Sequence, residues 1–216
     1  MKRKVVLVDD HPIVRQGLAQ LIDSEEDLQI VGEAQDRSSA LDVIHEKQPD
    51  IALVDLTLKN SNGIELIKDL KSIKPDLPVL VLSLHDENVY AERVIRAGAK
   101  GFIMKAEATE TLLDAIRTVL RGGVYLSSKM KEAVLSHAFA PQDRKRGPLD
   151  ALSDREFEVF QYIGDGKDTK EIAEGLFLST KTVETYKSHI RSKLGLKNTT
   201  ELIQYAVKWK VESEKM

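Results

Sequence analysis

Short apolar runs without alternating polarity recur through the first half of the chain. A run of this kind is typical of a strand that is buried on both faces, as in a parallel sheet covered by helices. We therefore expect five strands, over residues 5–8, 28–34, 51–54, 79–83 and 101–104.

Between these runs, apolar residues recur at the spacing of an amphipathic helix. The spacing predicts a helix that begins at Pro12 and further helices over residues 38–47, 64–73, 87–97 and 109–121. Strands that alternate with helices predict an α/β fold with a doubly wound, five-stranded parallel sheet.

Polar side chains stand where four of the expected strands end. Asp9 and Asp10 close the first strand, Asp55 the third, Ser83 the fourth and Lys105 the fifth. The carboxyl ends of parallel strands form one edge of the sheet, where ligands bind in open α/β folds, so we expect these groups to converge. A lone aspartate after a strand would be better explained by a turn, where aspartate is common.

The predicted cluster has the chemistry of a phosphoryl-binding pocket. Three crowded carboxylates repel one another, and a bound cation relieves that repulsion. Oxygen ligands without cysteine favour a hard ion such as Mg²⁺. Lys105 and Ser83 would bind a phosphoryl group, and a carboxylate would be available as the nucleophile. The alternative is a structural cation or a solvated acidic rim.

Helical patterns alone fill the second half of the chain. We expect a helix over residues 126–139, followed by a polar linker flanked by prolines over residues 140–148. Ser153 followed by Glu156 forms a capping box that predicts the start of the next helix.

A helix-turn-helix pattern follows. A short helix is expected from Asp168, and a longer helix runs from Thr180 to Leu194, where Gly195 closes it. In this arrangement the second helix enters the major groove of DNA.

The longer helix has a polar face that suits DNA. At about 100° per residue, Val183, Ile190 and Leu194 face the core. We expect base edges to be read by Glu184 and by the hydroxyl side chains, and phosphates to be held by the cations. The candidate DNA contacts are Lys181, Thr182, Glu184, Thr185, Lys187, Ser188 and Arg191. An ordinary solvated surface helix would also show a polar outer face.

Charge is unevenly distributed along the chain. The net charge is −3, but residues 141–216 carry 14 Lys and Arg against 13 Asp and Glu, so the first 140 residues hold the acidic excess. A basic helix in an acidic chain is consistent with nucleic-acid binding. The absence of cysteine fits a reducing cytoplasm, and we expect no export signal and no membrane-spanning helix.

Residues 1–122 resemble the flavodoxin-like receiver domain of bacterial two-component response regulators. The resemblance is carried by Val8-Asp9-Asp10-His11, Val54-Asp55, Leu80-Val81-Leu82-Ser83 and Gly101-Phe102-Ile103-Met104-Lys105. It implies that a sensor histidine kinase or a small phosphodonor phosphorylates Asp55. It also implies that Mg²⁺ is held by Asp9, Asp10, Asp55 and the main-chain carbonyl of Thr57. Ser83 and Lys105 would contact the phosphoryl group, and Phe102 would be the aromatic that rotates inward. Lys59 departs from the proline common in this family, which leaves the rigidity of that loop open.

Residues 152–209 resemble the DNA-binding domain of the LuxR/NarL/FixJ class. The resemblance is carried by Leu-Ser-Asp-Arg-Glu at 152–156, Lys-Glu-Ile-Ala at 170–173, Ser-Thr-Lys-Thr-Val-Glu-Thr-Tyr at 179–186 and Lys-Leu-Gly at 193–195. It implies a dimer contact on the last helix, for which we name Leu202, Ile203, Ala206 and Val207, and a homodimer when the protein is phosphorylated or bound to DNA.

These observations predict a receiver domain over residues 1–122, a helix and linker over 123–150 and an all-α helix-turn-helix domain over 151–211. We expect a transcription regulator gated by phosphorylation, not an enzyme. One alternative is a regulator that binds DNA regardless of phosphate and uses the receiver for protein contacts. The other is a phosphohydrolase with an aspartate nucleophile, but Thr57 stands where such enzymes place an acid/base aspartate.

Overall fold

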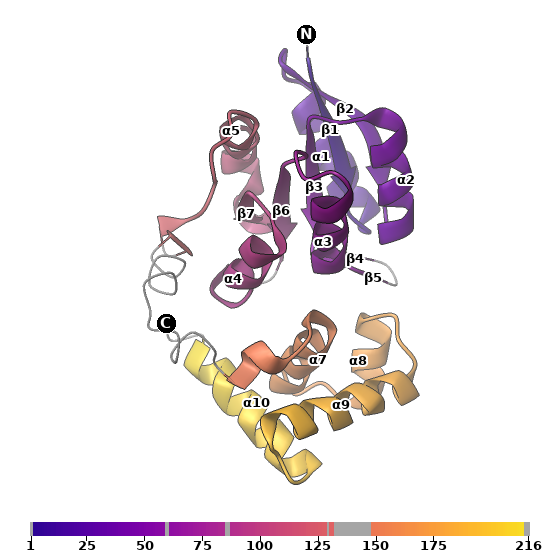
Figure 1. The fold of residues 1–216 in the computed structure, drawn as a ribbon, viewed down its shortest axis with the longest axis vertical. Helices are drawn as coiled ribbons and strands as arrows, with labels where there is room; N and C mark the ends of the chain where they lie inside the picture. The colour runs from indigo at the N-terminus through magenta and orange to yellow at the C-terminus, as the bar shows by residue number, and fades with distance from the viewer. Residues whose placement is uncertain (1, 59–60, 85–86, 129, 132–147, 214–216) are drawn as a thin grey trace. The chain divides into compact units, whose positions relative to one another are not determined.

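The structure is a computed structural model, and it describes residues 2–58, 61–84, 87–128, 130–131 and 148–213. The chain divides into two compact units, residues 1–134 and residues 135–216 (Figure 1). The helix expected over 126–139 and the linker expected over 140–148 lie largely outside the described residues.

A five-stranded parallel sheet forms the centre of the first unit. Its strands lie in the order β2-β1-β3-β6-β7, which confirms the predicted doubly wound fold. The order reverses between β1 and β3, so the carboxyl ends of these two strands flank the point where such sheets bind ligands. The strands are β1 (Arg3–Val8), β2 (Leu28–Ala34), β3 (Ile51–Asp55), β6 (Val79–Ser83) and β7 (Gly101–Met104).

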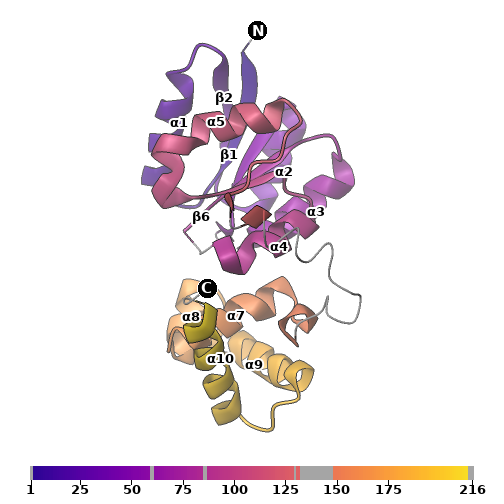
Figure 2. The ribbon, with the colours of Figure 1, turned by 90° about the vertical axis from the view of Figure 1, so that its left-hand side faces the viewer.

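Helices cover both faces of this sheet. Figure 2 shows α1 (Pro12–Asp23) and α5 (Ala108–Leu120) over one face, and Figure 1 shows α2 (Arg37–Lys47), α3 (Gly63–Ile73) and α4 (Glu87–Ala97) on the other. Alternate strand residues such as Val5 and Leu7 point into the core beneath α1 and α5. The middle strands are buried on both faces, which explains why their sequences lack alternation.

A small hairpin follows β3 and was not predicted. It consists of β4 (Thr57–Leu58) and β5 (Ser61–Asn62), and Asn62 Oδ1 then accepts the Ile64 and Glu65 N–H groups at the start of α3. At Gly63 a Cβ atom would lie 2.2 Å from the Asp55 carbonyl oxygen, so the hairpin needs glycine to pack against the end of β3. Lys59 lies outside the described residues.

The first unit continues beyond α5. Tyr125 N–H donates to the Lys100 carbonyl and Tyr125 O accepts from Phe102 N–H, so this segment pairs alongside β7. Leu126 and Met130 are buried. The residues directly after 122 therefore pack on the sheet unit.

The second unit is all helical among the described residues: a short 3₁₀ turn, η3 (Pro148–Ala151), precedes α7 (Asp154–Gly164), α8 (Thr169–Gly175), α9 (Thr180–Leu194) and α10 (Thr199–Ser213). Ser153 and Glu156 form the predicted capping box, and Gly195 at φ +68 ends α9. Tyr205 and Trp209 of α10 pack against Phe160 of α7. The predicted helix-turn-helix is present as α8 and α9.

Candidate functional site

Three side chains from three strand ends meet in the first unit. Lys105, which follows β7, places Nζ 2.6 Å from Asp55 Oδ2 and 2.7 Å from Asp9 Oδ2. All three side chains are at most 5% exposed. The structure thus brings together the nucleophile candidate, the carboxylate that directly follows β1 and the lysine predicted for the pocket.

Burial and charge act against each other at Asp55. Desolvation raises the pKa of Asp55 to about 6, and Asp9 adds to the rise, although Lys105 and the Thr57 N–H lower it. Burial would lower the pKa of Lys105, but its contacts with Asp55 and Asp9 raise it above the usual range. The pocket therefore holds a charged lysine between two buried carboxylates.

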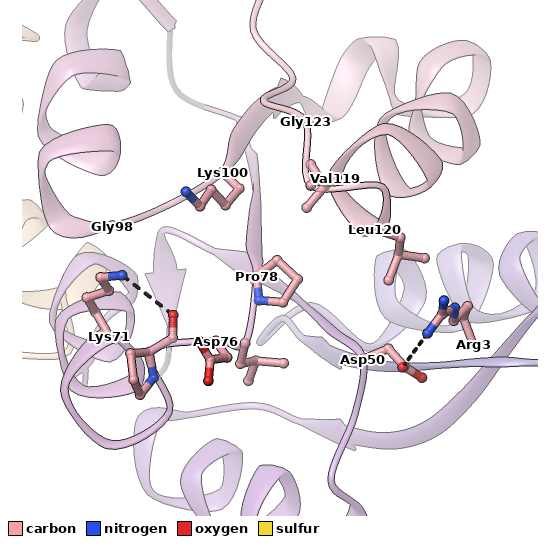
Figure 3. A pocket seen from close by; sticks show the side chains of 13 residues that line it. Arg3, Asp50, Lys71, Asp76, Pro78, Gly98, Lys100, Val119, Leu120 and Gly123 are labelled. Atoms are coloured by element: carbon pink, nitrogen blue, oxygen red, sulfur yellow. Dashed lines mark hydrogen bonds and ion pairs between the residues drawn. The ribbon is translucent and has the colours of Figure 1, made fainter.

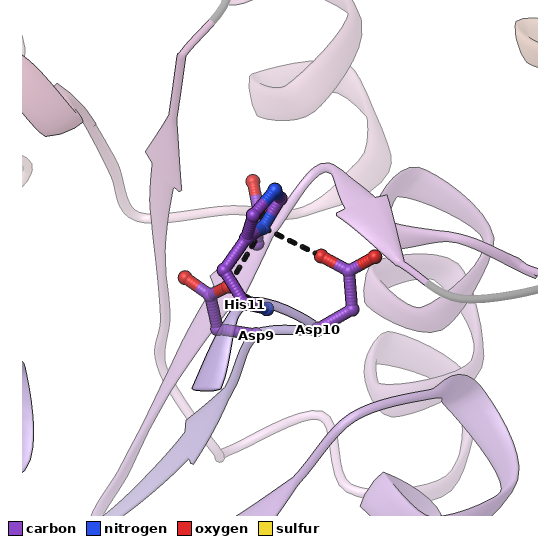
Figure 4. A group of neighbouring side chains, drawn as sticks. Asp9, Asp10 and His11 are labelled. Carbon is purple, nitrogen blue, oxygen red and sulfur yellow. Dashed lines mark hydrogen bonds and ion pairs between the residues drawn. The ribbon is translucent and has the colours of Figure 1, made fainter. Parts of the chain in front are cut away.

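Asp10 and His11 extend the acidic cluster (Figure 4). The His11 ring nitrogen Nδ1 lies 2.7 Å from Asp10 Oδ1 and 3.3 Å from Asp9 Oδ1. Carboxylate oxygens of Asp9, Asp10 and Asp55 and a ring nitrogen of His11 all lie within 4.8 Å of one another. His11 was not expected in this cluster from its sequence position.

The cluster fits a divalent cation. Asp9 Oδ2 and Asp10 Oδ1 are buried and accept no hydrogen bond from the described part of the chain. Lys105 Nζ lies 2.7 Å from Asp9 Oδ2, and His11 Nδ1 lies 2.7 Å from Asp10 Oδ1. Buried carboxylate oxygens with free lone pairs at a sheet edge are the donors that a hard cation uses.

The other predicted pocket residues lie close to this cluster. Ser83 is fully buried and ends β6, one residue beyond the Asp55–Leu82 pair. Thr57 begins β4, and its N–H is bonded to the Asp55 carboxylate. Phe102 lies in β7 opposite Val81 and is 2% exposed, so its ring is packed inside the protein.

Arg15 supports the end of β1 and was missed by the sequence reasoning. Its Nη1 group donates to the Asp9 carbonyl at 2.6 Å, and its Nε donates to Glu33 Oε2 at 2.9 Å. Arg15 lies one helical turn into α1, so only the fold reveals that it reaches back over the pocket. The contact holds the main chain between the two neighbouring aspartates.

A second hollow lies at the opposite, amino-terminal edge of the sheet (Figure 3). It has a volume of about 450 Å³, and its lining includes Arg3, Asp50, Pro78 and Lys100, which precede or begin four strands. Arg3 and Asp50 form an ion pair of 3.0 Å at one side of it. None of the predicted site residues lines this hollow.

The α9 helix presents most of its predicted DNA contacts to solvent. Val183 and Ile190 are fully buried, whereas Lys181, Glu184, Thr185 and Ser188 are exposed. Thr182 and Arg191 are half-buried at the flanks of this face. The helix therefore has the inner and outer faces that its sequence predicts.

Lys187 departs from the prediction. Its side chain is only 12% exposed, and Nζ lies 2.5 Å from Thr169 Oγ1 and 3.2 Å from Glu184 Oε1. Lys187 was expected to hold a phosphate, but its charge is directed at Glu184 within the domain. Thr169, on the preceding helix, was not among the candidate residues.

The predicted dimer residues on α10 divide into two pairs. Leu202 and Ala206 are fully buried because they face α7 and the aromatic core of their own domain, which corrects their assignment to a dimer surface. Ile203 and Val207 are 46% and 40% exposed, and Val211, one turn later, is 47% exposed. An apolar stripe thus remains on the outside of α10.

In the described part of the chain, no helix combines the length and the apolar character needed to cross a membrane.

Comparison with known proteins identifies both units. Residues 5–117 match the response regulator receiver domain, and residues 150–206 match the bacterial regulatory proteins of the luxR family. The oxygen regulatory protein NreC of Staphylococcus carnosus (strain TM300) is 37% identical over 213 residues, which covers 96% of this chain and 98% of that protein.

Solved structures agree over nearly the whole chain. RcsB of Salmonella enterica serovar Typhimurium, bound to promoter rprA with the phosphomimetic BeF3⁻, is 26% identical and superposes with a TM-score of 0.62. That similarity covers 96% of this chain and 99% of the RcsB chain. A structure of two RcsB dimers bound to two parallel DNAs has 25% identity and a TM-score of 0.58, over 95% of this chain and 98% of that one.

Proposed function

The chain belongs to the two-component response regulators of the LuxR class, and from this premise we propose that Asp55 is the residue that a sensor histidine kinase phosphorylates. The observation that carries the proposal is the contact of Asp55 Oδ2 with Lys105 Nζ beside Asp9 at the carboxyl edge of the sheet. A carboxylate in that position attacks the phosphorus of a phosphohistidine or of a small phosphodonor.

Asp9 and Asp10, together with Asp55 and the main-chain carbonyl of Thr57, are proposed to hold Mg²⁺. The donor set supports this, because two of its buried carboxylate oxygens have no hydrogen bond from the described residues. The cation would neutralise charge on the phosphoryl oxygens during transfer. Arg15 keeps the Asp9 main chain in place from outside the cluster.

Lys105 and Ser83 are proposed to bind the phosphoryl group once it is attached. Lys105 already contacts the accepting carboxylate, and Ser83 ends the neighbouring strand. Phe102 is the proposed switch residue, and its buried ring in β7 lies opposite Val81, two residues before Ser83 on β6. Movement of Ser83 toward a phosphoryl group would change the space available to that ring.

The second unit is a LuxR-type DNA-binding domain, and we infer that α9 reads double-stranded DNA in the major groove. The outward residues Lys181, Glu184, Thr185 and Ser188 support this role, with Thr182 and Arg191 at the flanks. The RcsB dimers on DNA support assembly of this chain as a homodimer, through the apolar stripe on α10. A regulator of this kind acts on chromosomal DNA, so we place it in the cytoplasm.

The decisive test is phosphorylation of the full-length Asp55→Asn variant by acetyl phosphate with Mg²⁺, compared with Asp76→Asn. Asp76 is an exposed aspartate away from the pocket, so its variant should incorporate one phosphate like the wild type. The Asp55→Asn variant should incorporate none, because an amide does not attack phosphorus. Equal incorporation by both variants would refute the assignment of Asp55.

The same samples separate the alternatives. Sustained release of inorganic phosphate from small phosphomonoesters would identify a phosphohydrolase. Equal affinity of phosphorylated and unphosphorylated protein for its selected DNA would identify a regulator that binds regardless of phosphate. The proposed function requires a single incorporated phosphate, no sustained turnover and a change in DNA affinity.

A further inference from the structure

Three polar groups link the start of α8 to the outward face of α9. Thr169 Oγ1 donates to Glu184 Oε1 at 2.7 Å, and Lys187 Nζ donates to both oxygens, at 2.5 Å and 3.2 Å. A threonine hydroxyl has one donor and two acceptor positions, so Thr169 can donate to Glu184 and accept from Lys187 at the same time. The arrangement is a closed triangle that crosses between two helices.

The triangle fixes a side chain that would otherwise be mobile. The Glu184 side chain is 59% exposed, and a glutamate with that exposure ordinarily samples several rotamers. Both bonds end on Oε1, and no donor in the described part of the chain reaches Oε2. One carboxylate oxygen is therefore held while the other is presented to solvent on the outward face of α9.

The triangle also compensates the charge of Glu184. A carboxylate on a helix that enters a DNA groove is repelled by the phosphates, and the Lys187 ammonium offsets that repulsion. Lys187 is 12% exposed, so its ammonium is enclosed beside Glu184 and has little surface to offer a phosphate. The hydrogen bond from Thr169, followed by the contact with Lys187, holds the pKa of Glu184 below its usual value, which keeps it an acceptor.

We propose that Thr169 is a positioning residue for DNA recognition: it orients Glu184 so that Oε2 accepts from a base amino group, with cytosine N4 as the preferred partner. Glutamate accepts from the exocyclic amino group of cytosine in the major groove. A carboxylate that is already oriented loses less rotamer freedom on binding, so its preference for one base is stronger. The proposal rests on the proposed function, because it requires α9 to read DNA.

The fold does not need the Thr169 hydroxyl. Asp168 caps α8, since its side chain accepts the Lys170 and Glu171 N–H groups. Buried apolar residues of α8 and α9, including Ile172 and Val183, pack the two helices together. Removal of the hydroxyl should therefore change DNA recognition and leave the domain folded. Comparison of the unfolding temperatures of the variant and the wild type checks that the fold is kept.

The experiment uses the full-length protein and duplexes selected from a library randomised over the binding site. Affinity is measured for the selected duplex and for each single base-pair change, at several salt concentrations. Thr169→Val is compared with Thr169→Ser, which keeps the hydroxyl, and with Thr199→Val, a threonine at the first position of α10. Thr169→Ala replaces the valine variant if the latter does not fold.

Thr169→Val should reduce discrimination at one base pair by about fivefold, the scale of one typical hydrogen bond, and leave other positions unchanged. Thr169→Ser and Thr199→Val should behave like the wild type. Glu184→Ala should remove the preference at the same base pair, and Thr169→Val should add nothing in that background. Lys187→Met should alter the base preference at that position. It should leave the salt dependence of binding unchanged, whereas loss of a phosphate contact would lower the salt slope by about one.

Three results would overturn the proposal. Thr169→Val could show the same base preference as Thr199→Val, or it could lose affinity equally for all duplexes. Lys187→Met could lower the salt slope and keep the base preference of the wild type. Failure of the wild-type protein to select any preferred duplex would refute DNA reading by α9 itself. Selection by the wild type with no effect of Thr169→Val would refute only the role of Thr169.

Discussion

Lys105 Nζ lies 2.6 Å from Asp55 Oδ2, although the two residues are 50 positions apart in the chain. The contact joins the segment after β7 to the end of β3 and gives the buried Asp55 carboxylate a counter-charge. The same ammonium lies 2.7 Å from Asp9 Oδ2, so it stands between two carboxylates that repel each other. Its removal should affect both the charge state and the reactivity of Asp55.

Lys105→Met should slow phosphorylation of Asp55 by acetyl phosphate at neutral pH by at least about tenfold. Burial already raises the pKa of Asp55 to about 6, and loss of the lysine removes the two interactions with Lys105 that oppose this rise. Transfer would also lose a cation beside the phosphoryl oxygens. Initial rates at several pH values measure the effect, with Lys100→Met as the control, because Lys100 precedes β7 at the other end of the strand. Equal rates for the two variants would contradict the role of Lys105.

Asp55→Asn should stabilise the metal-free protein, increasingly so as pH rises from 4 to 7. The folded-state pKa of Asp55 is about 6 and its ordinary value is 3.8, so between these values the native state binds more protons than the unfolded state. The free energy of unfolding therefore falls with rising pH in this window, and above pH 6 the full cost remains. Asparagine carries no such cost, and the gain at pH 7 should approach an upper limit of about 3 kcal/mol.

Urea unfolding in the presence of a chelator, at closely spaced pH values, measures this difference. Asp76→Asn is the control, since Asp76 is exposed. The difference in unfolding free energy between Asp55→Asn and the wild type could instead stay constant from pH 4 to pH 7. That result would show that burial does not raise the pKa of Asp55.

Asp10→Ala should weaken Mg²⁺ binding while Asp55 and Lys105 keep their contact. Asp10 Oδ1 is one of the buried oxygens without a hydrogen bond from the described residues, so its loss removes a ligand and one charge of the cluster. We expect the dissociation constant to rise at least about tenfold, the scale of one lost carboxylate ligand. Calorimetric titration with Mg²⁺ measures it, and Asp76→Ala serves as the matched control. An unchanged titration would remove Asp10 from the ligand set.

The sheet could be predicted from the sequence because its strands are buried on both faces. Residues 51–55 and 79–83 are fully buried, and such strands have no polar positions to obscure their apolar runs. The pocket could be predicted for a related reason, since parallel strands end at one edge and carry their terminal side chains there. The hairpin after Asp55 was missed because strands of two residues have no periodicity to detect.

In the helical domain the differences between sequence and structure concern partners that lie far along the chain. Lys187 looks like a free cation until α8 brings Thr169 against it, and this pairing spans 18 residues. Leu202 and Ala206 look like part of an apolar surface because the whole of α10 is rich in apolar residues. Only the packing of α10 on α7 shows which of them face inward.

An apolar stripe runs along the outside of α10, where Ile203, Val207 and Val211 recur every fourth residue. Three apolar side chains at this spacing lie side by side, and burial between two copies of the helix would stabilise a dimer on two DNA half-sites. Val207→Lys places a charge at the centre of that contact, and Ile203→Lys places one at its edge. Neither position is in the core, so the domain should remain folded.

These variants should weaken binding of the full-length protein to a duplex with two half-sites by at least about tenfold and barely change binding to a single half-site. Glu212→Gln is the matched control, because it raises the charge of the same helix by one unit, as Val207→Lys does, about 140° from Val207 and at a side chain that is 62% exposed. An added lysine attracts DNA wherever it stands, so the control corrects for that gain. Affinity for both duplexes, measured at the same salt concentration, decides the role of the stripe: equal losses on one and two half-sites would mean that it supports the fold of a single copy and not the pairing of two.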